Sequence, residues 1–405
     1  MMTINKANQI NRNIGLYIHL PFCQRKCSYC GFLSLANQPQ TLIQQYLTNL
    51  LVESNLQFDE LERNKDISET YQYIIDTIYI GGGTPSLING KDMITLLEGI
   101  RKKWPITETA EITMESNPNS LTAENMHAYL KAGVNRLSIG VQSFDDAILE
   151  EIGRLHDAKS AVSAVGMAKD AGFANINIDL MFGLPGQTLQ QWEATLHTAV
   201  SLEPTHLSLY TLQIEEGTKL YHDYKADKLP MVDLDVDRAC YHYAINYLKS
   251  NGYNQYEISN FAKENYVCKH NLKYWSLDDF LGIGINASSC LAGRRWRNLT
   301  DLNQWTSQIE NRQLPIDPVS MHQDSFRDAM GIFVFTGLRK KEGISLEEFK
   351  SRFGVEFFKV YADRMVQLKQ YQLQGQMDWS DSITGRVWIT EAGIDHSNEI
   401  MSEFV

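Results

Sequence analysis

The chain has 405 residues, of which 43% are apolar and 21% charged, a composition typical of a globular protein rather than a disordered one. Its net charge of −12 at pH 7 argues against broad binding to nucleic acid or to an anionic membrane, because both need a positive surface. The sequence contains no signal-peptide pattern and no apolar run long enough to span a bilayer, so we expect a cytoplasmic protein.

The first 250 residues repeat one unit, in which a short β-rich run is followed by a turn and then by a helical pattern. Strands are predicted over residues 15–20, 77–80, 111–115, 136–140, 175–182 and 206–210, and helices over 41–63, 91–103, 121–131, 157–171, 188–201 and 231–250. Near-continuous apolar strands that alternate with helices indicate a parallel sheet covered by helices. Six units are too few for a full eight-stranded barrel, so we predict an α/β fold with a partial (β/α)6 barrel, similar to an incomplete TIM barrel, over residues 1–250.

The remaining residues, 251–405, have a different pattern. They are loop-rich and aromatic up to about residue 297, and helical patterns return from about residue 317. Ser345 and Glu348 have the spacing of a capping box, and residues 386–390 are predicted to form a strand. We therefore predict a smaller α+β domain at the C-terminus, similar to a winged helix.

Polar, glycine-rich or thiol residues follow every predicted strand of the barrel. In chain order these are the cysteines after Pro21, GGGTP at 81–85, ESNP at 115–118, Gln142 with Ser143, Asp179 with GLPG at 183–186, and Tyr210 with Thr211. In parallel α/β folds the functional site gathers at the carboxyl ends of the strands. Because all six strand ends lie at the same edge of the predicted sheet, they predict one large site.

Three cysteines, Cys23, Cys27 and Cys30, form a C-x3-C-x2-C motif directly after the first strand. Three thiolates at this spacing can bind three irons of a [4Fe–4S] cluster and leave the fourth iron open to a ligand that is not protein. The alternative is a zinc site completed by a distant His or Cys, although structural zinc sites usually show two paired motifs.

This motif, with the aromatic Tyr29 before its last cysteine, resembles that of the radical S-adenosylmethionine (SAM) superfamily. In that superfamily the amino and carboxylate groups of SAM chelate the open iron, and the reduced cluster passes one electron to the sulfonium to give a 5′-deoxyadenosyl radical. The resemblance implies a [4Fe–4S] cluster and SAM as cofactors, and an electron donor such as flavodoxin or ferredoxin as a partner.

The other strand ends fit the same resemblance. It places Gly82, Gly83 and Thr84 at the amino group of SAM, because glycine lets the backbone approach a ligand, although a tight turn is the alternative explanation of the glycines. The segments YIHLPFC, GGGTPS, ESNP, GVQSF and DLMFGLPGQT resemble a narrower subgroup across residues 15–215, the oxygen-independent coproporphyrinogen III oxidases and their relatives. Those oxidases bind two SAM molecules. The resemblance implies that Tyr17 and Glu115 serve the first SAM, and that Gln142, Arg154 and Asp179 serve the second.

The sequence departs from the oxidases in two places. Phe32 stands where the oxidases carry a further cysteine, and little chain precedes Cys23, where the oxidases have a longer extension that contacts substrate. A second motif, H-N-x-x-Y-W at 270–275, resembles the signature of the HemW family of heme chaperones, in which it is implicated in heme binding.

This second resemblance implies a role in heme binding for four residues: His270 as an iron ligand, Asn271 at a propionate, and Tyr274 and Trp275 against the porphyrin face. The alternative is a buried aromatic cluster with a hydrogen-bonded histidine that seals the barrel. Arginines near two tryptophans could also meet the propionates, but we expect a solvated surface loop there; these residues are Arg294, Arg295, Trp296, Arg297 and Trp305.

The sequence thus predicts a heme chaperone that binds heme, passes it to an acceptor hemoprotein and performs no classical turnover. One alternative is an oxygen-independent coproporphyrinogen III oxidase, and another is a radical SAM enzyme with a different substrate. We expect no nucleic-acid partner and no transmembrane segment. Transient membrane association would follow only if the acceptor were a membrane hemoprotein.

Overall fold

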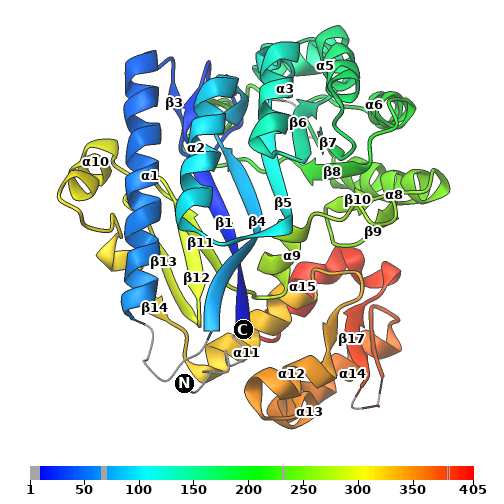
Figure 1. Cartoon of the computed structure of the whole chain (residues 1–405). Helices are drawn as coiled ribbons and strands as arrows, with labels where there is room; N and C mark the ends of the chain where they lie inside the picture. Colours follow the sequence, from blue (N-terminus) through cyan, green and yellow to red (C-terminus); the bar gives the residue numbers. More distant parts are fainter. Residues whose placement is uncertain (1–9, 65–70, 230–232, 381, 383) are drawn as a thin grey trace, which may run out of the picture.

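The computed structural model describes residues 10–64, 71–229, 233–380, 382 and 384–405. Six parallel strands form the centre of its main sheet, and each pairs with the next one along the chain. They are β1 (Ile10–Leu20), β4 (Tyr71–Gly82), β5 (Ile106–Ser116), β6 (Arg136–Gln142), β7 (Ile176–Phe182) and β8 (His206–Thr211). The predicted partial barrel of six parallel strands is therefore confirmed (Figure 1).

Helices connect these strands and cover the outer face of the sheet (Figure 1). They are α1 (Gln40–Arg63), α2 (Gly90–Lys103), α3 (Ala123–Ala132), α5 (Ala158–Ala171), α6 (Leu189–Ser201) and α8 (Leu234–Ser250). Five of them begin after a residue whose side chain accepts a hydrogen bond from the first turn; these residues are Asn89, Thr122, Asp157, Thr188 and Asp233. Residues 231–232 of the last predicted helix lie outside the described residues. Two short helices, α4 (Asp146–Glu151) and α7 (Lys219–Lys225), were not predicted.

The strands β1, β4 and β5 begin earlier than the sequence predicts. The first residues of β1 and β5 are mostly polar or charged, as in INRN and ITETA, so these two strands begin without the apolar run on which the prediction relied. These first residues are held by pairing between strands, for example Asn11 with Gln72. Their pairing, rather than their side chains, extends the sheet.

The main sheet continues past residue 250, where the sequence predicts a domain boundary. On one side of the barrel, β11 (Phe280–Ile283) runs parallel to β1, and β12 (Ser288–Leu291), β13 (Arg294–Arg297) and β14 (His322–Gln323) follow as an antiparallel meander. On the other side, β10 (Asn260–Ala262) and β9 (Asn254–Gln255) add to β8. We expected a surface loop at residues 294–297, but these residues form the strand β13. Trp305 of α10 (Leu302–Glu310) is buried in the core.

A second hydrophobic core begins at Met330 and ends at Phe404, whereas the first core ends at Ile309. Its helices are α11 (Phe326–Gly337), α12 (Leu346–Phe353), α13 (Phe357–Val360), α14 (Met365–Leu373) and α15 (Ser397–Ser402). They pack with an antiparallel sheet of β15 (Ile344–Ser345), β17 (Arg386–Ile389) and β16 (Met377–Trp379). In Figure 1 this part lies at the opposite end of the main sheet from β3 (Leu35–Ala36). In the described part of the chain, none of the helices combines the length and apolar character that crossing a bilayer requires.

Candidate functional site

The three predicted ligand cysteines lie on one loop at the carboxyl end of β1. Cys23 ends the short strand β2 (Phe22–Cys23), which pairs with β3, and Cys27 and Cys30 follow on the loop. The loop is anchored by its backbone, because Ser28 N donates to Ile152 O at 3.2 Å and Leu220 N donates to Ser28 O at 2.9 Å. All three thiols are half-buried and free of disulfides.

The thiols are close enough to influence one another. Burial raises the pKa of Cys23 and of Cys30, and in both cases the neighbouring Cys27 raises the pKa further. Among the described residues, no three His, Cys, Asp or Glu side chains are arranged to hold a single metal ion.

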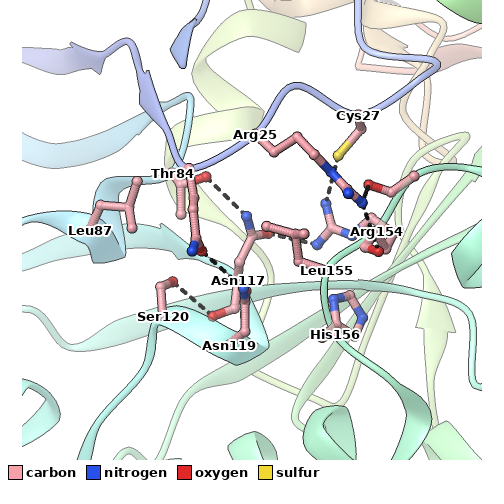
Figure 2. Close-up of a pocket in the computed structure, with 12 residues that line it drawn as sticks. Arg25, Cys27, Thr84, Leu87, Asn117, Asn119, Ser120, Arg154, Leu155 and His156 are labelled. Atoms are coloured by element: carbon pink, nitrogen blue, oxygen red, sulfur yellow. Dashed lines mark hydrogen bonds between the residues drawn. The ribbon is translucent and has the colours of Figure 1, made fainter. Parts of the chain in front are cut away.

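A chain of hydrogen bonds joins two of these thiols, Cys23 and Cys27, across the ends of three strands. Figure 2 shows the part of this chain from Thr84 to Cys27. Thr84 Oγ1 donates to Cys23 Sγ at 3.6 Å, and Asn117 Nδ2 donates to Thr84 Oγ1 at 2.9 Å. Arg154 completes the chain, since its Nη2 donates to Asn117 Oδ1 at 2.7 Å and its Nη1 donates to Cys27 Sγ at 3.5 Å. Each of the two sulfurs therefore accepts a hydrogen bond, one of them from a positive charge.

The glycines at the end of β4 allow its backbone to pass the cysteine loop. A Cβ on Gly83 would lie 2.6 Å from Phe22 O, and a Cβ on Gly82, whose φ is +113°, would lie 2.6 Å from His19 Cε1. Gly83 N donates to Leu20 O at 2.8 Å, and Thr84 N donates to Phe22 O at 2.7 Å. The turn is therefore locked against the loop that carries the cysteines.

Glu115 lies inside the barrel beside this turn. Its Oε2 accepts from Gly82 N at 3.1 Å, and its Oε1 accepts from Tyr79 Oη at 3.0 Å. Burial, and next the negative charge of Asp179, raise the pKa of Glu115 to about 7. The ring of Tyr17 stacks on that of Tyr79 with centroids 6.3 Å apart, so Tyr17 belongs to the same cluster.

The residues predicted to serve a second SAM lie on the neighbouring strands. Asp179 accepts from Ser138 Oγ at 3.0 Å and from Asn177 Nδ2 at 2.8 Å, and burial raises its pKa. Gln142 follows a bulge between β6 and β7 and has a φ of +70°, a conformation that non-glycine residues rarely adopt. Arg154, as described above, is turned toward Cys27.

The H-N-x-x-Y-W motif lies elsewhere in the barrel, on the short helix α9 (Lys269–Trp275). Glu111 of β5 caps this helix, because its carboxylate accepts from Lys269 N at 3.1 Å and from His270 N at 3.2 Å. His270 is fully buried, and both of its ring nitrogens are bonded: Nδ1 to Thr77 Oγ1 at 2.8 Å and Nε2 to Tyr274 Oη at 2.8 Å. Burial lowers the pKa of His270 to about 3, so the ring is neutral.

The last two residues of the motif face other partners. The ring of Tyr274 meets Phe280 of β11 edge-on, with centroids 4.7 Å apart, and the guanidinium of Arg339 lies 4.5 Å from the ring centre of Trp275. Asn271 is half-buried on the same helix. The structure thus brings the predicted cluster and SAM residues together at the strand ends, and it places the heme motif nearer the middle of β4, at the level of Thr77.

Three residues of this arrangement were not among the predicted site residues: Asn117, Tyr79 and Glu111. Asn117 stands in the ESNP segment at a strand end, so its position was a usable signal. Tyr79 and Glu111 lie within strands, and no local pattern distinguishes them from other residues that face the inside of a barrel.

Comparisons with known proteins agree with this geometry. The family model described as the radical SAM superfamily matches residues 17–199, and the HemN C-terminal domain matches residues 325–396. The heme chaperone HemW of Bacillus subtilis is 34% identical over 390 residues, which cover 96% of this chain and 98% of that protein. HemW of Escherichia coli is 41% identical over 274 residues, which cover 68% of this chain and 69% of that protein.

Among solved structures, the coproporphyrinogen III oxidase HemN of Escherichia coli, described as a radical SAM enzyme, superposes with a TM-score of 0.82. The match covers 97% of this chain and 90% of the oxidase at 22% sequence identity, and it supports the fold alone. The end-to-end similarity to HemW shows that this chain belongs to the HemW family of the radical SAM superfamily.

Proposed function

We propose that this protein is a heme chaperone, which binds heme and passes it to an acceptor hemoprotein. The observation that carries the proposal is the 34% identity to a protein named as a heme chaperone over nearly the whole length of both chains. We propose further that the protein acts in the cytoplasm and that flavodoxin or ferredoxin reduces its cluster.

The residues at the strand ends fit the cofactors of the superfamily, a [4Fe–4S] cluster and SAM. Cys23, Cys27 and Cys30 would bind three irons, and a cluster thiolate at Cys23 would keep the hydrogen bond from Thr84. When bound, the reduced cluster can supply one electron to SAM.

The first SAM would meet the turn at Gly82, Gly83 and Thr84, with Tyr17, Tyr29 and Glu115 around it. A pKa of about 7 lets the Glu115 carboxyl change charge near neutral pH. An ammonium group beside it would favour the carboxylate. Gln142, Arg154 and Asp179 remain our candidates for a second SAM; Arg154 would then have to exchange its bond to Cys27 for one to that ligand.

Heme binding is assigned to the motif on α9, within which the four residues have different roles. As an iron ligand, His270 would have to give up one of its two hydrogen bonds. We therefore assign it the role of a positioning residue that holds Tyr274, while Tyr274 and Trp275 contact the porphyrin and Asn271 contributes a polar group.

The similarity of fold to the oxidase favours one other function, the decarboxylation of coproporphyrinogen III. Phe32, at the position of the further oxidase cysteine, is 71% exposed and offers no thiol. Anaerobic protein with a reduced cluster, SAM and coproporphyrinogen III should form no protoporphyrinogen; steady formation would replace the chaperone proposal with the oxidase.

The chaperone function is tested by heme transfer. Cluster-loaded protein is saturated with hemin, freed of excess hemin and mixed with a heme-free globin, whose holo spectrum reports the transfer. We expect transfer by the wild type and weaker heme loading by His270→Ala. Lys341→Ala is the control, because Lys341 lies outside α9 and its ammonium pairs with Glu391 at 3.2 Å. Failure of the wild type to retain heme would refute the proposal.

A further inference from the structure

A cavity of about 460 Å³ lies beside α9, and none of the cofactor residues lines it. Its volume is within the range of roughly 300–1,000 Å³ that is usual for small-molecule sites. One wall is the β11–β13 part of the main sheet, and the other walls are α9 and α11. Aromatic and aliphatic side chains supply much of the lining: Tyr274, Trp275, Leu277, Phe280 and Ile332.

The strand register shows which side chains face the cavity together. Phe280 pairs with Cys290, and Cys290 pairs with Arg295, so these three side chains project from the same face of the sheet. Ser288 pairs with Arg297 on that same face. Two arginines and a buried thiol therefore stand on the wall opposite Trp275.

The walls also contain donors that lack acceptors. Arg295 uses its Nε to bind Asp324 at 3.0 Å, but its Nη2 is buried without a partner, and so is the indole Nε1 of Trp275. Arg297 is half-exposed and lies 3.6 Å from Asp317. Unpaired donors beside an apolar surface suit a ligand that is mainly apolar and carries carboxylates.

We propose that this cavity is the heme site, in which the porphyrin lies on the apolar wall, its propionates bind Arg295 and Arg297, and Cys290 binds the iron. The inference rests on the proposed function and deepens it. It places heme in this cavity, where His270 does not bind the iron. The motif on α9 then contributes a wall, with His270 fixing Tyr274 through the hydrogen bond at 2.8 Å.

Cys290 is suited to bind the iron by its place and its neighbour. The side chain is 7% exposed and stands in register between Phe280 and Arg295. Thiolate is an established ligand of heme iron, and a metal ion displaces the thiol proton. The Sγ–Fe bond forms as this proton passes to water, and the oxidation state of the iron does not change.

The experiment measures binding of hemin and of iron-free protoporphyrin IX to the full-length, cluster-loaded chain. Arg297→Gln removes a charge, Arg295→Lys keeps the pairing with Asp324 but removes the Nη2 donor, and Ser288→Trp fills the rim. We expect each arginine variant to raise the Kd for both porphyrins about tenfold, as the loss of one charge-assisted hydrogen bond predicts. Ser288→Trp should weaken the binding of both porphyrins because the indole occupies part of the cavity. The control is Arg294→Gln, because Arg294 is exposed on the same strand and faces the other way.

Cys290→Ala distinguishes the contribution of the bond to iron from that of the contacts with the porphyrin. It should weaken hemin binding and shift the Soret band while leaving the affinity for protoporphyrin IX unchanged. An unchanged hemin spectrum would overturn the assignment of Cys290. If the wild type binds hemin but the three wall variants bind it as Arg294→Gln does, the cavity is wrong and the chaperone function stands; if the wild type binds no hemin, the proposed function itself has failed.

Discussion

Asn117 connects the two halves of the cysteine site, because its amide donates to Thr84 and accepts from Arg154. Asn117→Ala removes both bonds at once, so Thr84 loses its donor and the Nη2 of Arg154 keeps only its bond to Gly140 O. Groups that support metal ligands typically contribute about 10–100-fold to metal affinity, so we expect the cluster to lose iron to a chelator about tenfold faster. Iron and acid-labile sulfide content measure the loss.

The matched control for that variant is Asn119→Ala in the same pocket (Figure 2). Asn119 is exposed and donates only to Gln24 Oε1, at 3.3 Å, among the bonds that the structure shows for its side chain. Equal rates of iron loss from the two variants would contradict a role of the hydrogen-bonded chain in holding the cluster.

Gly83 tests the close approach between the β4 turn and the cysteine loop. Gly83→Ala places a methyl group against the backbone of Phe22, which cannot rotate away as a side chain could. We expect a loss of about 1–3 kcal/mol in the free energy of unfolding, measured by urea denaturation. Gly166→Ala is the opposite case, because Gly166 lies inside α5 with nothing within 4 Å of an added Cβ, and it should stabilise by about 0.5–1 kcal/mol. Equal changes in the free energy of unfolding for Gly83→Ala and Gly166→Ala would contradict the close contact between Gly83 and the Phe22 backbone.

At the scale of elements, one buried carboxyl joins α1 to the segment after β11 and to α10. Glu53 accepts hydrogen bonds from Gly284 N at 2.9 Å, Trp305 Nε1 at 3.1 Å and Asn298 Nδ2. Despite these donors, burial raises the pKa of Glu53 from 4.5 to about 8. Folding therefore favours the protonated form, so its contribution to stability is complete below about pH 4.5 and is lost as the pH rises through about 8.

Glu53→Gln removes this titration. Glu115, with its raised pKa of about 7, also contributes less to the free energy of unfolding as the pH rises, and its pH range overlaps that of Glu53. Wild type and variant must therefore be compared at each pH. Between pH 5.5 and 8.5 the variant should gain roughly 3 kcal/mol relative to the wild type in urea unfolding. Glu98→Gln, at an exposed position of α2, should show no such gain. A difference that does not vary with pH would contradict the buried position of Glu53.

Local patterns predicted the elements of the barrel and missed those that depend on distant partners. The apolar runs in β1, β4 and β7 and the amphipathic helices between them carry their own signal. β11 is only four residues long and contains Gly282, so it carries little signal of its own. Its pairing with β1 makes it a strand. His270 shows the same limit, because the residue that occupies its Nδ1 is Thr77, which stands 193 positions earlier in the chain.

For the whole molecule, the sequence predicted the fold class, and its motifs named candidate cofactor residues that the fold gathers at the strand ends. Its division of the chain at residue 250 differs from the division between the two hydrophobic cores, which falls between Ile309 and Met330. The reason is that β9–β14 lie after residue 250 and yet complete the first sheet. The proposed heme cavity depends on this, since β11–β13 and α11 meet only in the folded chain.

Binding of heme as cargo by a cluster-bearing chain of this fold is best tested by an anaerobic hemin titration of the full-length protein, with its iron and sulfide content measured beforehand. We expect a Soret shift that saturates near an equal concentration of hemin. A cluster-loaded protein that showed no saturable shift would contradict it.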